Sequence, residues 1–153
     1  GVDLSGKDFG LSTMSGKEKI GTIFTGANLS DTNLTGTDLS GKDLTGTIFT
    51  GANLSDTNIS GIDLSGKDLT GTILTGADLS DTLLLDANLT GANLQNADLK
   101  RALLVDANLS NVILTGADLS QAILTGTILT GANLENAILT NTILNCIGHS
   151  ICI

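Results

Sequence analysis

A five-residue periodicity runs through almost the whole chain. Of the 29 residues whose numbers end in 4 or 9, from Leu4 to Leu144, all but Lys19 are Leu, Phe, Met or Ile, and the phase never slips. On an α-helix, a step of five residues advances about 500°, which would spread these side chains around the surface. On a flat strand, an odd spacing would alternate them between opposite faces. They share one interior only if the chain turns a corner every five residues.

The residues around each central apolar position fit such a corner. Two residues after the centre, 25 of the 29 positions hold Gly, Asp or Asn, which tolerate the positive φ of the third residue in a type II turn. Two residues before the centre, the side chain is mostly Ala or Thr, and a small residue beside a large one suits a narrow, filled interior. The four turn positions that depart from the pattern are Leu11, Arg101, Gln121 and Cys146.

The repeat resembles the sequence motif of a known protein family. The strings at 26–30 (GANLS) and 116–120 (GADLS) resemble the A(D/N)LXX motif of the pentapeptide-repeat family, and the abundance of such strings is similar to that in cyanobacterial members. The resemblance implies an all-β fold, a right-handed quadrilateral β-helix with four pentapeptides per coil and about seven coils. We therefore expect a single domain over 1–153, with regular repeats over about 2–145 and a C-terminal cap over 146–153.

A second regularity supports four sides per coil. Outward residues just before the centre, taken every 20 residues, form columns of one kind, such as Asp78, Asp98 and Asp118. Residues 22–46 and 47–71 are identical at 22 of 25 positions, which indicates a duplicated unit of five pentapeptides. Because a coil holds four pentapeptides, each copy is rotated by one face.

The charge and composition of the chain limit the kinds of partner that it can bind. The formal net charge of −9 argues against direct binding to nucleic acid or to an anionic membrane, both of which need a basic surface. No apolar run is long enough to span a membrane, and we expect no signal peptide in the given sequence, whose first residue, Gly1, is consistent with a processed or truncated end. The compartment stays open. The sequence favours the cytoplasm, with the periplasm or the thylakoid lumen as alternatives if the two cysteines are bridged.

No catalytic or cofactor-binding residue is expected. Ser and Thr are abundant, but a single histidine near the chain end provides no Ser–His–Asp arrangement, and a smooth rod offers no cleft that would raise the pKa of a carboxyl group. Cys146, His149 and Cys152 form C-x2-H-x2-C, yet three ligands fall short of the four of a structural zinc site. We expect no metal. A Cys146–Cys152 disulfide that braces the cap and two free thiols remain the alternatives, and His149 keeps the five-residue phase, which indicates a capping role.

Five lysines conflict with the repeat. Lys19 occupies a central position, and four others lie two residues before the centre, where side chains point inward. An unpaired buried ammonium group is too costly, so we expect a bulge at Lys19. For the other four, we expect the aliphatic stems to pack inside while the ammonium groups leave at a corner. These four are Lys7, Lys17, Lys42 and Lys67.

One face carries an acidic column. Its carboxylates are Glu18, Asp38, Asp78, Asp98 and Asp118. Quinolone-protection members of the family resemble B-DNA in shape and charge and bind type II topoisomerases, so the resemblance offers DNA mimicry towards gyrase as an alternative function. Five carboxylates over roughly 24 Å give about one charge per 5 Å, whereas duplex DNA carries one per ~1.7 Å. The column is about threefold too sparse, and this function ranks second.

A neighbouring face carries an apolar strip. Stacked coils would bring its aliphatic side chains about 4.8 Å apart into one exposed patch, which suits a symmetric side-by-side homodimer or the complementary face of another protein. The alternative is that the side chains only cover the coil edges of a monomer. The sequence thus predicts a non-catalytic structural or protein-interaction module whose physiological partner it does not name. The residues of the strip are Leu83, Leu85, Leu103, Val105, Ile123 and Ile143.

Overall fold

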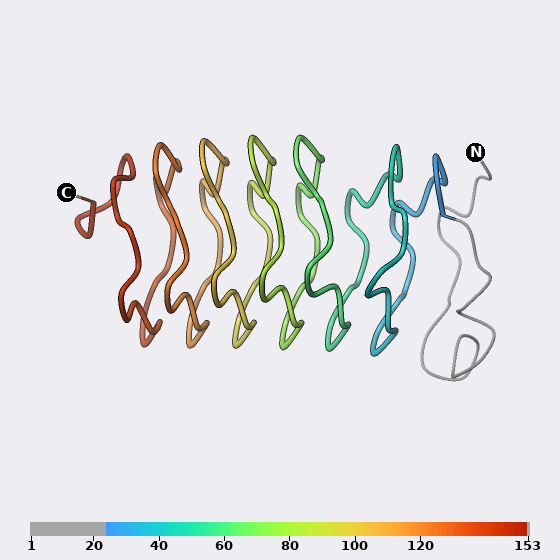
Figure 1. Ribbon diagram of the computed structural model, residues 1–153, viewed down its shortest axis with the longest axis horizontal. Helices are drawn as coiled ribbons and strands as arrows, with labels where there is room; N and C mark the ends of the chain where they lie inside the picture. The colour runs from blue at the N-terminus through green and yellow to red at the C-terminus, as the bar shows by residue number, and fades with distance from the viewer. Residues whose placement is uncertain (1–23, 153) are drawn as a thin grey trace.

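The fold is a rod of stacked coils (Figure 1). The computed structural model describes residues 24–152. Within that range there is no helix and no strand of several residues. Instead, isolated parallel bridges connect the coils. All but the last join a residue to the one 20 positions later, as in Asn28–Ile48 and Leu83–Leu103. Twenty residues per coil, with a corner every five, give the four sides that the columns predict.

The corners have the predicted conformation. Every residue two positions after a centre, from Gly26 to Asn141, has a positive φ between 55° and 72°. The amide three residues after the centre donates to the carbonyl of the central residue, for example Ala97 N to Leu94 O at 3.0 Å, which closes the turn. Arg101 and Gln121 adopt φ of 59° and 62° although neither favours this region. At these two corners the stacked coils impose the conformation.

The interior holds the central residues and those two positions before them. Leu84 and Leu104 have no exposed surface, and Ala102 between them is equally buried. Most buried threonines find an acceptor for their hydroxyl. Thr82 Oγ1, for instance, donates to the carbonyl of Leu79 at 2.7 Å. Such a hydroxyl avoids the cost of an unsatisfied polar group, whereas the buried hydroxyl of Thr37 has no partner within residues 24–152.

Backbone hydrogen bonds hold the coils together, three per pentapeptide. At one typical step, the amides of Leu84 and Asp86 donate to Leu103 O at 2.8 Å and to Val105 O at 3.0 Å, and the amide of Leu103 donates back to Thr82 O at 3.0 Å. The same pattern recurs along most of the described chain. Removal of one coil therefore exposes a full row of donors and acceptors.

This ladder is interrupted at one place. Between residues 41–49 and 60–68, six consecutive bonds of the ladder are missing among the residues that the structure describes. In Figure 1, one loop in the teal-green part of the ribbon lies out of line with its neighbours along the upper edge. Lys42 and Lys67 lie on the two sides of the interruption, half-buried, and both line an open cleft there. We expected the stems of these two lysines to pack inside an intact rod. The two lysines lie instead where two coils have separated. Lys7, Lys17 and Lys19 lie outside the described residues.

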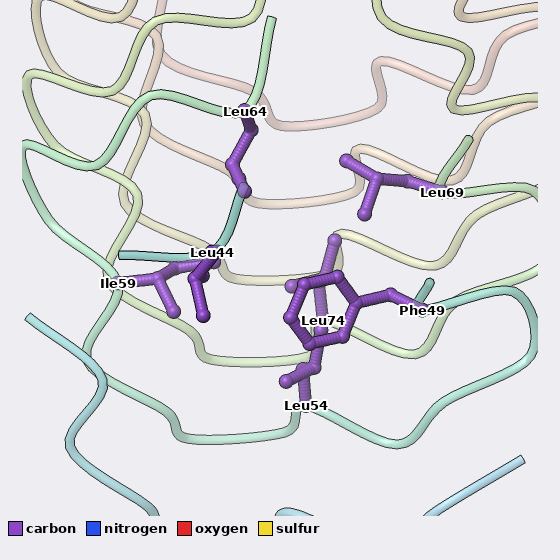
Figure 2. A pocket seen from close by; sticks show the side chains of 7 residues that line it. All are labelled: Leu44, Phe49, Leu54, Ile59, Leu64, Leu69 and Leu74. Atoms are coloured by element: carbon purple, nitrogen blue, oxygen red, sulfur yellow. The ribbon is translucent and has the colours of Figure 1, made fainter. Parts of the chain in front are cut away.

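The core next to this interruption is slightly under-packed. A void of about 10 Å³ lies between seven central side chains from consecutive sides of the rod, which point into the same interior (Figure 2). A void of this size has room for at most one water molecule, and its lining is apolar, so it stays dry. The separation of the two coils therefore opens outward and leaves the interior closed. The lining residues are Leu44, Phe49, Leu54, Ile59, Leu64, Leu69 and Leu74.

The C-terminal segment confirms the disulfide and corrects one expectation. Cys146 and Cys152 are bridged, with their Cα atoms 4.9 Å apart. The last bridge joins Ile128 to Ile147, 19 positions apart, so the five-residue phase slips by one after position 144. His149 consequently does not hold a central position. Its Nδ1 accepts a hydrogen bond from the amide of Ile151 at 3.3 Å, and its carbonyl accepts one from the amide of Cys152 at 3.1 Å, which fastens the terminal turn.

Replacement of Gln121 by Asn should stabilise the protein. Asn tolerates the left-handed region better than Gln, so the substitution removes local strain at this corner. We expect the free energy of unfolding to rise by about 0.5 kcal/mol, since substitutions that relieve backbone strain act on this scale. Urea denaturation measures the change. Gln95→Asn, at a position next to a corner without positive φ, is the matched control, and an equal gain there would show that corner strain is not the cause.

Loss of the disulfide should destabilise the C-terminal cap. The bridge closes a short loop, with a sequence separation of 6, for which chain entropy gives about 2 kcal/mol. The double variant Cys146→Ser with Cys152→Ser should lose about that free energy of unfolding in urea, and amide exchange should accelerate in the last coil first. Unchanged exchange over residues 129–152 would contradict a bracing role.

Candidate functional site

Most outward Asn and Asp residues before a centre have a structural task. Asn28 Oδ1 accepts hydrogen bonds from Ser30 N at 3.0 Å and from Ser30 Oγ at 2.7 Å. Asp78 and Ser80 repeat this arrangement at 2.9 and 2.6 Å. The carboxylate or amide oxygen thereby caps the turn that follows. A signal for this was present in the sequence, because Ser or Thr commonly stands two residues after such an Asn or Asp.

The acidic column forms as predicted over the described residues. Parallel bridges connect Asp38 through Asn58 to Asp78, Asp98 and Asp118, whereas Glu18 lies outside the described residues. The column is not uniformly negative. Lys100 Nζ lies 2.8 Å from Asp98 Oδ2 and 3.2 Å from Asp118 Oδ2. One ammonium group therefore neutralises part of the charge where carboxylates lie on consecutive coils.

The pKa shifts reflect this pairing. Hydrogen bonds to Asp98 and Asp118 raise the pKa of Lys100. Burial tends to raise the pKa of Asp118, but hydrogen bonds from Ser120 and Lys100 outweigh it and the pKa is lowered. At the adjacent corner, Arg101 Nε donates to Asp81 Oδ1 at 2.7 Å, and this bond lowers the pKa of Asp81. The sequence analysis considered only the carboxylates of the column and did not predict the ion pairs of Lys100 and Arg101. A signal was present, because Arg101 lies 20 residues after Asp81 and Lys100 lies two residues after Asp98.

The apolar strip also forms as predicted. Bridges connect Leu83, Leu103, Ile123 and Ile143 into one column, in which half of the Ile143 side chain is exposed and the others are partly exposed. Leu85 and Val105, beside the following corner, are partly exposed as well. Unlike Asn or Asp at the equivalent positions, these side chains cap no turn. Their outward surface is therefore available for contact.

The two long edges of the strip differ in charge. The corner residues before it include Asp81 and Arg101, and those after it include Asp86 and Asp106. All four are exposed. Because Arg101 and Asp106 flank the same side of one coil, they lie at the same height along the rod, on opposite edges of the strip.

The open cleft lies on the same face, N-terminal to the strip. Asp63, which lines the cleft, bridges directly to Leu83. The cleft has a volume of about 330 Å³ and is lined by two lysines, two aspartates and neutral residues. Its lining residues are Lys42, Asp43, Leu44, Thr45, Gly46, Ile62, Asp63, Ser65 and Lys67.

The charges in this cleft are only loosely paired. Burial lowers the pKa of Lys67, while Asp63 and Asp43 oppose that shift from a distance. Within residues 24–152, neither Lys42 nor Lys67 has a carboxylate within ion-pair distance. Hydrogen bonds from Thr45 and Ser65 lower the pKa values of Asp43 and Asp63, so both carboxylates are engaged by their own turns. Sequence reasoning noticed the lysines and missed the cleft, because no local pattern reports a separation of coils.

The described residues lack two further features. Residues 24–152 contain no group of three or more His, Cys, Asp and Glu side chains placed to hold a metal ion. The same residues contain no helix that is long and apolar enough to cross a membrane.

The corners, the 20-residue coil and the filled interior define a solenoid built from tandem five-residue units. The family model for pentapeptide repeats (8 copies) matches residues 27–66, 68–101 and 102–141. The chain belongs to the pentapeptide-repeat family. Members of this family are generally non-enzymatic structural or interaction modules.

Solved structures of the same family resemble this chain. HetL, a pentapeptide repeat protein involved in heterocyst differentiation regulation from the cyanobacterium Nostoc sp. strain PCC 7120, is 33% identical over 100% of this chain and 70% of its own, with a TM-score of 0.47. Rfr23 from the cyanobacterium Cyanothece 51142 is 34% identical over 82% and 90%, with a TM-score of 0.47. QnrB1, a plasmid-mediated fluoroquinolone resistance protein, is 22% identical over 95% and 79%, with a TM-score of 0.61. Comparison with curated protein sequences finds no significant match.

Proposed function

We propose that this protein is a non-catalytic interaction module that binds a protein partner through the apolar strip, and that the partner is a second copy of the chain. The winding that we infer is right-handed, with about seven coils. The observation that carries the proposal is the column Leu83–Leu103–Ile123–Ile143, which is continuous through three coil steps. The rod supplies a rigid, straight support, so little conformational entropy is lost when the strip is covered.

The residue choice in the strip supports a role in contact. At the equivalent position on other sides, Asn or Asp caps the next turn, as Asn108 does for Ser110 with bonds of 3.0 and 2.7 Å. Leu103 and Ile123 forgo this stabilisation. Isolated apolar residues on a surface need no explanation, but a contiguous patch indicates a binding surface.

The charged edges favour one arrangement of two copies. A two-fold axis parallel to the rods places the edge before the strip opposite the edge after it on the other copy. Arg101, which also pairs with Asp81 of its own chain, would then face the partner's Asp106 at the same height. An antiparallel arrangement would place like edges together and lose this pairing.

Disruption of the strip should abolish dimerisation without unfolding the rod. Leu103→Asp with Ile123→Asp introduces the residue that the repeat prefers at this position, so the melting temperature should change little while the charge repels a second copy. Sedimentation velocity should find a dimer for the unaltered protein and a monomer for the variant. Ile113→Asp, at an isolated exposed isoleucine on another face, is the control and should remain dimeric.

A charge exchange tests the orientation. Asp106→Arg alone should weaken the dimer, and adding Arg101→Asp should restore it, because the exchange swaps the signs on both edges. If the unaltered protein sediments as a monomer at high concentration, the second copy is the wrong partner. A double variant that does not regain the dimer lost in Asp106→Arg would exclude the parallel arrangement.

The acidic column supports a second candidate, a DNA mimic that binds a type II topoisomerase. Asp78, Asp98 and Asp118 are stacked on consecutive coils. Lys100 weakens the resemblance to duplex DNA because it lies against two of these carboxylates. We therefore rank this function below the interaction module.

A supercoiling assay with purified gyrase separates the two candidates. We expect no inhibition by the unaltered protein at low micromolar concentration, since its charge is too sparse and partly neutralised. Potent inhibition that grows when Lys100→Ala removes the neutralising cation, and is lost in Asp98→Asn with Asp118→Asn, would reverse the ranking.

The disulfide bears on the compartment. Disulfides persist in oxidising environments and are rare in the reducing cytosol. The Cys146–Cys152 bridge thus supports an oxidising compartment over the cytoplasm that the sequence favoured. Thiol labelling of protein isolated from its cells without reductant would test this, because two reactive thiols would indicate a reducing compartment.

A further inference from the structure

The interrupted ladder exposes backbone groups on both sides of the cleft. On one coil, the amides of Leu44 and Gly46 have no partner within residues 24–152. On the next coil, the amide of Asp63 and the carbonyls of Asp63 and Ser65 are not used in the coil-to-coil ladder that the other coils form. In a regular step these groups bond to one another across the gap. Here they face one another over an open space of about 330 Å³. The two edges have the hydrogen-bonding pattern that a parallel extended segment between them would satisfy.

The apolar floor and the balanced charges of the cleft indicate which kind of ligand it can bind. Leu44 and Ile62, both buried, form an apolar floor. Two lysines and two aspartates line the sides, so the cleft as a whole carries no net charge. A lone anion or cation gains little there, whereas an uncharged peptide backbone meets complementary donors and acceptors. The volume lies at the lower end of the ~300–1,000 Å³ range of ligand pockets, which indicates a short segment.

We propose that this cleft binds an extended segment of a partner polypeptide, three or four residues long, which inserts between the two coils as an additional strand. The amides and carbonyls of this segment form hydrogen bonds with the backbone groups of both edges. One small or apolar side chain of the segment packs against Leu44 and Ile62. Lys42 and Lys67 keep the site open, because each replaces the Ala or Thr that most sides of the rod carry at this inward position. The site lies on the same face as the strip, N-terminal to Leu83, but it contains none of the strip residues and does not depend on dimerisation.

Amide hydrogen exchange tests this inference, with a blocked synthetic heptapeptide as the probe. The peptide copies residues 89–95 (LTGANLQ), one side of an intact coil, and so carries the hydrogen-bonding register of the ladder. In the free protein, the amides of Leu44, Gly46 and Asp63 should exchange at least about 100-fold faster than the equivalent amides of Leu64, Gly66 and Leu83. At saturating peptide, exchange of the first three should slow at least about tenfold.

Three controls distinguish insertion from other effects. The same peptide N-methylated at its Asn and second Leu, two amides that donate to neighbouring coils in the intact ladder, should give no protection. The double variant Lys42→Thr with Lys67→Thr restores the usual inward residue, so its ladder should close, its amides should be protected without peptide, and added peptide should change nothing. Lys100→Thr, which removes a lysine on another part of the rod, should respond to peptide as the unaltered protein does.

Three results would overturn the proposal. One is slow exchange at Leu44, Gly46 and Asp63 in the free protein, which would mean that the ladder is intact. Another is unchanged exchange at millimolar peptide, and the third is equal protection by the N-methylated peptide. The strip variant Leu103→Asp with Ile123→Asp should keep the full peptide response. The experiment therefore tests peptide binding in the cleft independently of the proposed dimer.

Discussion

The conformation at the corner is the constraint on which the rod depends. A positive φ at every fifth residue turns the chain through the same angle, so central side chains from all four sides meet inside and backbone groups face the adjacent coil. Gly, Asn and Asp make this conformation inexpensive at most corners. Once most corners are set, the stacking bonds hold Arg101 and Gln121 in a conformation that they would not adopt alone. Local propensity and long-range pairing therefore support each other, as minimally frustrated sequences require.

Because the interior and corners are fixed, the outward position before each centre is free to vary, and there the faces acquire different properties. Asn and Asp cap turns, as Asn28 does, and contribute to stability. Leu103 and Ile123 cap nothing and present apolar surface instead. Lys100 spans two coils and ties the acidic column together. One scaffold thus carries three distinct faces with hardly any change in its backbone.

Much of this structure could be predicted from the sequence, because its regularities are local and repeated. The buried centres, the corner positions and the columns at 20-residue spacing all follow from counting along the chain, and Asp78–Asp98–Asp118 is a simple case. The remainder depends on three-dimensional neighbours. The ion pairs of Lys100 needed distances between coils, the register slip before Ile147 needed the bridge partner, and the cleft beside Lys67 is a collective separation of two coils that no single residue specifies.

The interruption near Lys42 and Lys67 also bears on how the rod unfolds. In a solenoid each coil touches only its neighbours, so stability behaves as a chain of nearest-neighbour couplings. One step with six missing hydrogen bonds is a weak coupling in that chain. The coils before it and after it then behave as two cooperative blocks of unequal length, and the boundary between them is the point at which a pulling force or a denaturant would first divide the molecule.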